Sequence, residues 1–139
     1  MFKDASLKEQ MAGATAITVL IKDDKLYCAN AGDSRAIGCK NGIVQPLSFD
    51  HKPNNPGEMD RIYKAGGWVE FNRVNGNLAL SRALGDFVFK KNRHMTPEQQ
   101  IVTGKLISII NQCFGSVKCN WWFLRSNFCF TQIEYELFI

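Results

Sequence analysis

Asp33 is the first residue whose type and setting could support chemistry. It lies in the run AGDSR at residues 31–35, directly after a predicted strand and a glycine. A carboxylate on such a turn can bind a hard cation such as Mg²⁺ or Mn²⁺. The same residue can instead form an Asx turn that joins two strands. The residues alone favour the turn for Asp33, and favour it more strongly for Asp86, which also follows a glycine.

His51 is the second candidate, because Asp50 precedes it directly. A carboxylate can orient an imidazole for proton transfer. Side chains of adjacent residues diverge in extended backbone, however, so we expect His51 to position a loop. Residues 52–57 are rich in proline and asparagine, which indicates an exposed loop of the kind that often carries function.

Three arginines, Arg35, Arg73 and Arg82, interrupt otherwise apolar segments. A guanidinium can bind phosphate with two hydrogen bonds, and it can equally form structural ion pairs. The sequence leaves both alternatives open. It contains neither a Walker-type phosphate loop nor a Gly-x-Ser-x-Gly nucleophile motif.

Composition excludes several other classes of protein. The net charge of +4, from 17 basic and 13 acidic residues, forms no basic stripe, so we expect no nucleic-acid partner. No uncharged stretch is longer than residues 106–117, which are fewer than the ~18 apolar residues of a membrane-spanning helix. The sequence contains no Cys-x-x-Cys pair, so it does not predict a zinc site of the usual spacing. We expect Cys28 and Cys39 to be small buried hydrophobes. These features predict a protein that has no membrane partner. They also predict that it is located in a reducing compartment, the cytoplasm or the nucleus.

The elements that must position these residues are mostly short strands. The patterns predict strands at 15–21, 26–31, 35–39 and 43–49, with a tight turn at Asn41-Gly42 between the last two. The patterns also predict one helix. Asn55 would cap it, Pro56 would occupy its first position, and Gly66-Gly67 would end it. Further strands are predicted at 68–71 and 78–84.

Seven segments, taken together, resemble the metal-dependent Ser/Thr protein phosphatases of type 2C. They are residues 12–16, 29–35, 50–53, 61–62, 65–67, 73–76 and 78–86, and the resemblance extends over residues 12–103. It implies an α+β fold, a partial four-layer α/β-sandwich with two packed antiparallel sheets flanked by helices. It also implies a dinuclear Mg²⁺ or Mn²⁺ centre, where a metal-bridged water attacks a phosphoserine or phosphothreonine of a phosphoprotein substrate.

The resemblance assigns roles to particular residues. Asp33 would approach a further metal position beside the pair, and Arg73 would contact the substrate phosphopeptide. Residues 50–63 would form a flap beside the active site.

The departures from the family pattern are equally informative. The principal metal carboxylates of the family lie in Asp-Gly, Trp-Asp and Asp-Asn pairs, and none of these dipeptides occurs here. We therefore expect residues 1–103 to be the central part of a phosphatase domain, with weak metal affinity at Asp33 and no catalytic residue of its own. The alternative is a catalytically inactive regulatory or interaction fragment.

Residues 104–139 differ from the rest of the sequence. They hold three of the five cysteines and contain no proline. Gly104-Lys105 can be encoded as GGT-AAG, which contains a splice-donor sequence. Our hypothesis is that this segment is an unrelated hydrophobic tail translated from an intron, and that the chain alone is marginally stable.

Overall fold

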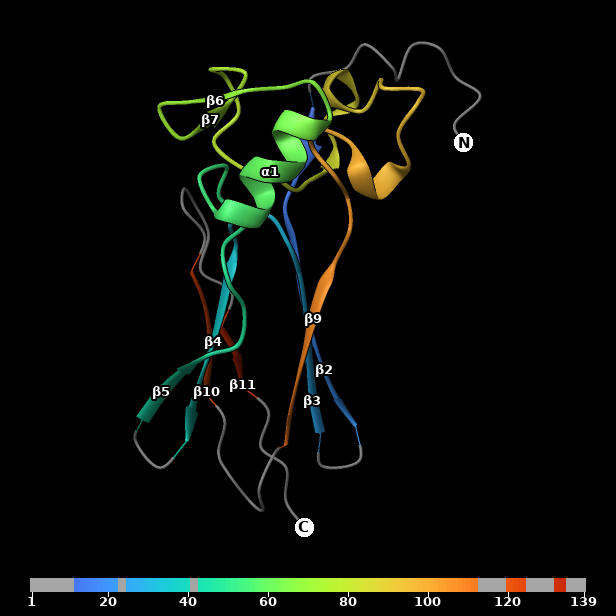
Figure 1. The fold of residues 1–139 in the computed structure, drawn as a ribbon. Helices are drawn as coiled ribbons and strands as arrows, with labels where there is room; N and C mark the ends of the chain where they lie inside the picture. Colours follow the sequence, from blue (N-terminus) through green and yellow to red (C-terminus); the bar gives the residue numbers. More distant parts are fainter. Residues whose placement is uncertain (1–11, 23–24, 41–42, 113–119, 125–131, 135–139) are drawn as a thin grey trace.

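Two antiparallel sheets form one end of the molecule (Figure 1). The computed structural model describes residues 12–22, 25–40, 43–112, 120–124 and 132–134. One sheet has the order β2 (Ala16–Lys22), β3 (Lys25–Ala31), β9 (Ile107–Gln112). The other has the order β11 (Gln132–Glu134), β10 (Asn120–Leu124), β4 (Arg35–Lys40), β5 (Ile43–Pro46). The predicted strands at 15–21 and 26–31 are confirmed, and they form the hairpin β2–β3 with Ala16 opposite Ala31 and Lys22 opposite Lys25.

The sheets pack through side chains that alternate along β3. Leu26 and Cys28 are buried against Ala36 of β4 and against Leu47. They face the same core because side chains two positions apart in a strand lie on one face. The predicted α+β class with two packed antiparallel sheets is confirmed. The prediction for Cys28 is also confirmed, and burial raises the pKa of its thiol.

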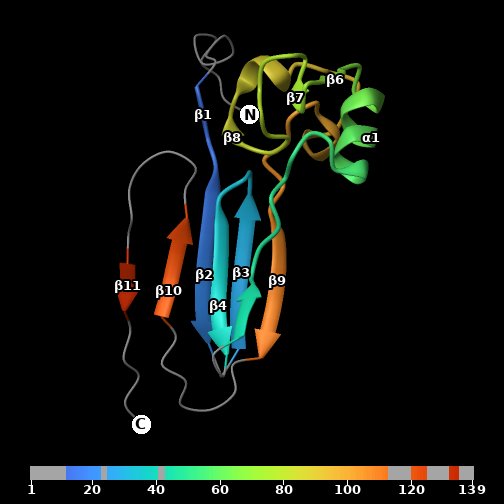
Figure 2. The same ribbon diagram turned by 90° about the vertical axis from the view of Figure 1, so that its left-hand side faces the viewer.

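A second group of elements gathers at the other end of the strands (Figure 2). Its helix α1 (Pro56–Lys64) has Pro56 in the first position, as predicted, and Ala65 at its C-terminal cap. Around it lie the hairpin β6 (Val69–Glu70) and β7 (Arg73–Val74), the pair β1 (Gly13–Ala14) and β8 (Leu84–Gly85), and the 3₁₀ helices η2 (Phe87–Phe89) and η3 (Pro97–Gln99).

A second apolar core holds this group together. Ile62 of α1 and Val74 of β7 are fully buried against Ala83 and Val102. The core is small, so polar contacts have a large share in fixing the loops between these short elements.

Two local predictions were wrong. Asn55 precedes α1 but makes no side-chain cap, because its amide donates to the backbone oxygen of Asp50 at 2.8 Å. Residues 78–84 do not form one strand, and only Leu84 lies in a strand, at the start of β8, because the backbone bonds of this segment go to separate partners. The N–H of Ser81 donates to His51 O, and the N–H of Ala83 donates to Thr103 O, both at 3.0 Å.

One predicted feature, the tight turn at Asn41-Gly42, lies outside the described residues. In the segment after residue 103, β9 pairs with β3 and β10 pairs with β4, both antiparallel. Among the helices of the described part of the chain, none has the length and apolar character to cross a membrane.

Candidate functional site

The turn between β3 and β4 is built around Gly32. Its φ of 109° lies in the left-handed region that favours glycine, and a Cβ at this position would overlap Thr15. The N–H of Gly32 donates to Nδ1 of His51 at 3.1 Å, and its oxygen accepts the backbone N–H of His51 at 3.0 Å. His51, which lies in the 50–63 segment, therefore fixes the turn that carries Asp33. This agrees with the loop-positioning role predicted for His51.

Two ion pairs join the same turn to the residues on either side of His51. Nζ of Lys52 lies 2.5 Å from Oδ2 of Asp33. The guanidinium of Arg35 donates to both oxygens of Asp50, at 3.0 and 2.9 Å. The Asp50 carboxylate is thus directed to Arg35, and Arg35 takes the structural role that the sequence left open. Asp33, the predicted metal residue, has an ammonium group as its nearest charged partner.

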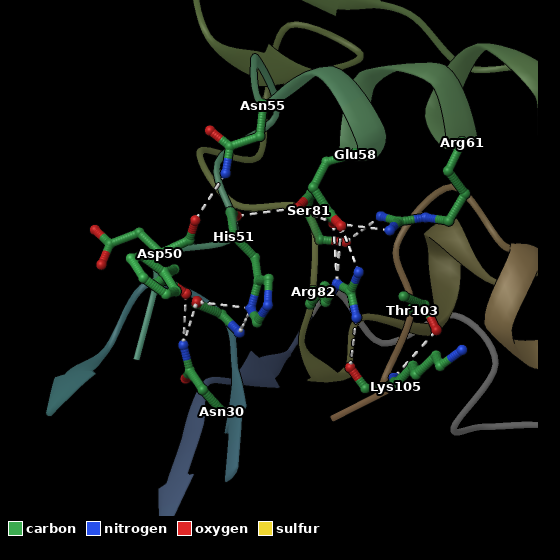
Figure 3. A network of polar contacts seen from close by, with 12 residues as sticks. Asn30, Asp50, His51, Asn55, Glu58, Arg61, Ser81, Arg82, Thr103 and Lys105 are labelled. Atoms are coloured by element: carbon green, nitrogen blue, oxygen red, sulfur yellow. Dashed lines mark hydrogen bonds and ion pairs between the residues drawn. The ribbon is translucent and has the colours of Figure 1, made fainter. Parts of the chain in front are cut away.

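A buried carboxylate lies at the centre of the 50–63 segment. Glu58 of α1 is 7% exposed and accepts hydrogen bonds from three side chains, as Figure 3 shows. Arg82 donates from Nη2 at 2.5 Å and Nε at 3.0 Å, Arg61 from Nη1 at 2.7 Å, and Ser81 from Oγ at 2.5 Å. We call these four residues the Glu58 cluster.

The two arginines of the Glu58 cluster also bind backbone oxygens from distant parts of the chain. Arg61 donates to Gln100 O at 3.1 Å and to Ser81 O at 2.7 Å. Arg82 donates to Lys105 O at 3.0 Å. Arg82 therefore has a structural role, and the cluster fixes three segments against helix α1.

The charges of the Glu58 cluster alter the acidities of two buried groups. Burial alone would raise the pKa of Glu58, but the hydrogen bonds from Arg82, Ser81 and Arg61 outweigh it and lower the pKa to about 2. Burial lowers the pKa of His51, and the nearby positive charge of Arg82 lowers it further. His51 is therefore neutral near pH 7, and Nδ1 can accept the Gly32 N–H.

Arg73, the predicted substrate contact, lies on β7 in the exposed hairpin. Its Nη1 donates to Asn77 O at 2.6 Å. Within the described part of the chain, no carboxylate lies within ion-pair distance of Arg73, and no hydrogen bond joins it to Asp33. The structure thus places the two predicted site residues on separate elements.

A cavity of about 220 Å³ lies beside the Glu58 cluster. Its lining includes Asn30, His51, Asn55, Glu58 and Ile107, and excludes both Asp33 and Arg73. Asn30 directs its amide nitrogen to Gly32 O and Phe49 O, which leaves its buried oxygen without a partner in the described residues.

Comparison with known proteins identifies the family. The sequence model described as Protein phosphatase 2C matches residues 1–108. The chain belongs to the protein phosphatase 2C family. It is 60% identical over 100 residues to a probable protein phosphatase 2C of Caenorhabditis elegans, covering 72% of this chain and 28% of that protein. It is 55% identical over 104 residues to protein phosphatase 2C homolog 2 of Schizosaccharomyces pombe, covering 74% and 28%.

A solved structure shows the same relationship. The crystal structure of a phosphatase from a pathogenic strain of Toxoplasma gondii aligns with a TM-score of 0.62 and 41% identity, and the match covers 71% of this chain and 30% of that one. The chain thus spans less than a third of the length of these relatives.

The residues that the structure describes do not form a metal centre. They contain no group of three or more histidine, cysteine, aspartate or glutamate side chains that could hold an ion. Asp33 supplies one carboxylate, and Lys52 already neutralises it. A dinuclear centre needs bridging carboxylates, so these residues of the phosphatase 2C chain do not fit one.

Sequence reasoning missed the Glu58 cluster. Glu58 falls within the predicted helix, and Ser81 falls within the segment 78–84 that was predicted to be a strand. The available signal was the Ser81-Arg82 pair within an apolar segment, because buried polar side chains need partners. Nothing in their spacing identified the partner, which lies 23 and 24 positions away.

Proposed function

We propose that this chain is part of a metal-dependent protein serine/threonine phosphatase that hydrolyses phosphoserine and phosphothreonine esters of phosphoproteins. The observation that carries the proposal is the match of the family model over residues 1–108. The expected cofactor of that enzyme is Mg²⁺ or Mn²⁺.

Within such an enzyme this chain would supply two contacts. Asp33 is the proposed metal contact, and its place on a turn fixed by Gly32 and His51 is consistent with a positioned ligand. Arg73 is the proposed substrate contact, because its guanidinium is exposed and has no carboxylate partner among the described residues.

The second proposal concerns the chain on its own. We infer that residues 1–103 form the central part of the domain and that residues 104–139 are an unrelated tail. A chain of this composition would be catalytically inactive and would act as a regulatory or interaction fragment in the cytoplasm or nucleus. The lack of a metal-binding group among the described residues favours this alternative.

Two measurements on the purified chain distinguish these proposals. Mn²⁺ is titrated calorimetrically into the chain and into Asp33→Ala, and phosphate release from a phosphothreonine peptide is measured alongside. We expect one weak binding event that Asp33→Ala abolishes, and no turnover. Two tight sites, or turnover that survives Asp33→Ala, would contradict the assignment of Asp33 and the inactive fragment.

The origin of residues 104–139 is tested separately on the gene. Sequencing the transcript and the genomic DNA across codon 104 should reveal an intron boundary there. A continuous exon through that codon would exclude the intron hypothesis and leave the family assignment unchanged.

A further inference from the structure

The tip of the β6–β7 hairpin carries an unusual residue. Phe71 and Asn72 form its two-residue turn with φ angles of 48° and 60°. This turn type needs left-handed backbone at both positions, which asparagine and glycine adopt readily. A phenylalanine there is strained by about 1 kcal/mol or more. The side chain of Phe71 is 90% exposed, so burial within the chain does not offset that strain.

The hairpin below this tip is firmly anchored. Val74 of β7 is fully buried in the second core. Trp68 and Asn75 close the base, since Trp68 N donates to Oδ1 of Asn75 at 3.0 Å and Asn75 N donates to Trp68 O at 2.8 Å. Phe71 is therefore presented from a fixed base, which reduces the entropy lost when it binds a partner.

The surroundings of Phe71 indicate what it could bind. Arg73 is two residues away, exposed, and without a carboxylate partner in the described residues. An aromatic side chain contacts an apolar side chain, and a guanidinium contacts a phosphate. Because residues 71 and 72 are left-handed, the backbone from 71 to 73 spans less than the ~7 Å of two extended residues. The two long side chains can still reach groups that lie two or three residues apart in a bound extended peptide.

We propose that Phe71 determines substrate preference by contacting an apolar side chain two or three residues from the phosphorylated serine or threonine. This inference rests on the proposed function, because Arg73 must contact the phosphate. It adds a contact that neither the metal position nor Arg73 explains. The strain at Phe71 then has a function, since a residue better suited to the turn would lack the apolar contact.

The test uses two fluorescently labelled phosphothreonine peptides and fluorescence anisotropy with the full chain. One peptide has leucine two and three residues from the phosphothreonine on each side, and the other has alanine at all these positions. We expect the leucine peptide to bind on the order of tenfold more tightly, as partial burial of one leucine allows. Phe71→Asn should abolish this preference while the dependence on phosphate remains.

The controls separate this proposal from its alternatives. Phe71→Asn suits the left-handed turn, so its thermal midpoint should equal or exceed that of the parent. Phe49→Asn removes another exposed phenylalanine, which is 66% exposed, and should leave the leucine preference intact. Phosphate-dependent binding without leucine preference would overturn only the role of Phe71. Binding that ignores both phosphate and Arg73→Ala would overturn the role of Arg73 in the proposed function as well.

Discussion

Glutamate 58 should contribute a large, pH-dependent part of the stability of this chain. Its pKa is lowered from 4.5 to about 2 by the hydrogen bonds of the Glu58 cluster, which outweigh the opposing effect of burial. One pKa unit corresponds to ~1.4 kcal/mol, so this difference corresponds to about 3 kcal/mol of unfolding free energy. Because the folded pKa is depressed, the contribution is complete above pH 4.5 and is lost as the pH falls toward 2.

The perturbation is Glu58→Gln, which removes the charge and keeps the shape. At pH 7 we expect it to lower the unfolding free energy by about 3 kcal/mol, because it leaves the buried Arg82 and the partly buried Arg61 without their carboxylate. The matched control is Asp60→Asn on the same helix. Asp60 pairs with Lys64 at 2.7 Å, but the two side chains are 61% and 71% exposed, so we expect less than about 0.5 kcal/mol.

The assay is urea denaturation followed by circular dichroism at pH values from 7 to 2.5. The parent and Glu58→Gln should differ most at pH 7 and converge below pH 3. If Glu58→Gln unfolds completely at pH 7, the loss is at least the stability of the parent. The reasoning is refuted if Glu58→Gln and Asp60→Asn have the same unfolding free energy at pH 7, or if the difference from the parent does not shrink in acid.

Three further predictions concern packing at glycine, the pH dependence due to His51, and the metal affinity of Asp33. Gly13→Ala should lower the unfolding free energy by about 1–3 kcal/mol, because its Cβ would overlap the buried Asp86 carboxylate. Gly57→Ala has open space around its Cβ and should be neutral or mildly stabilising. Thermal midpoints compare the two variants, and equal midpoints would contradict the packing of Gly13 against Asp86. Burial and the charge of Arg82 lower the pKa of His51, so the stability of the chain should fall as the pH drops below 6.5. Denaturation curves should show this fall in the parent and not in His51→Asn, whose amide oxygen can still accept the Gly32 N–H. A parent whose stability is constant between pH 7 and 5 would disprove this prediction. Lys52→Met removes the ammonium group beside Asp33 and should tighten Mn²⁺ binding several-fold by calorimetry, whereas unchanged affinity would argue against Asp33 as the ligand.

Local signals predicted the elements of the fold where the chain's own chemistry decides the structure. Pro56 and the Gly66-Gly67 pair delimited the helix, and the charged residues around 23 and 24 separated the strands of the β2–β3 hairpin. The strand expected at 78–84 failed because apolar composition alone cannot reveal which backbone groups will find partners. There Ser81 and Ala83 bind different segments, and no continuous ladder forms.

The candidate site was predictable only in part, for a related reason. The turn at Asp33 is encoded locally, because Gly32 must adopt a positive φ there. The partners of that turn are not local, since His51 and Lys52 are each 19 positions from Gly32 and Asp33. A carboxylate in a turn looks the same in sequence whether a metal, a lysine or a backbone N–H neutralises it. Spacing could therefore propose Asp33 as a metal residue but could not identify Lys52 as its neighbour.

The Asp33 turn and the Glu58 cluster are parts of one connected arrangement. Ser81 joins them, because its hydroxyl donates to Glu58 and its N–H donates to the backbone oxygen of His51. His51 in turn holds Gly32, the residue before Asp33. The second core buries few apolar residues, so it fixes these loops less completely than a large core would. The position of Asp33 should therefore depend on a carboxylate in helix α1 that neither contacts it nor lies near it in the sequence.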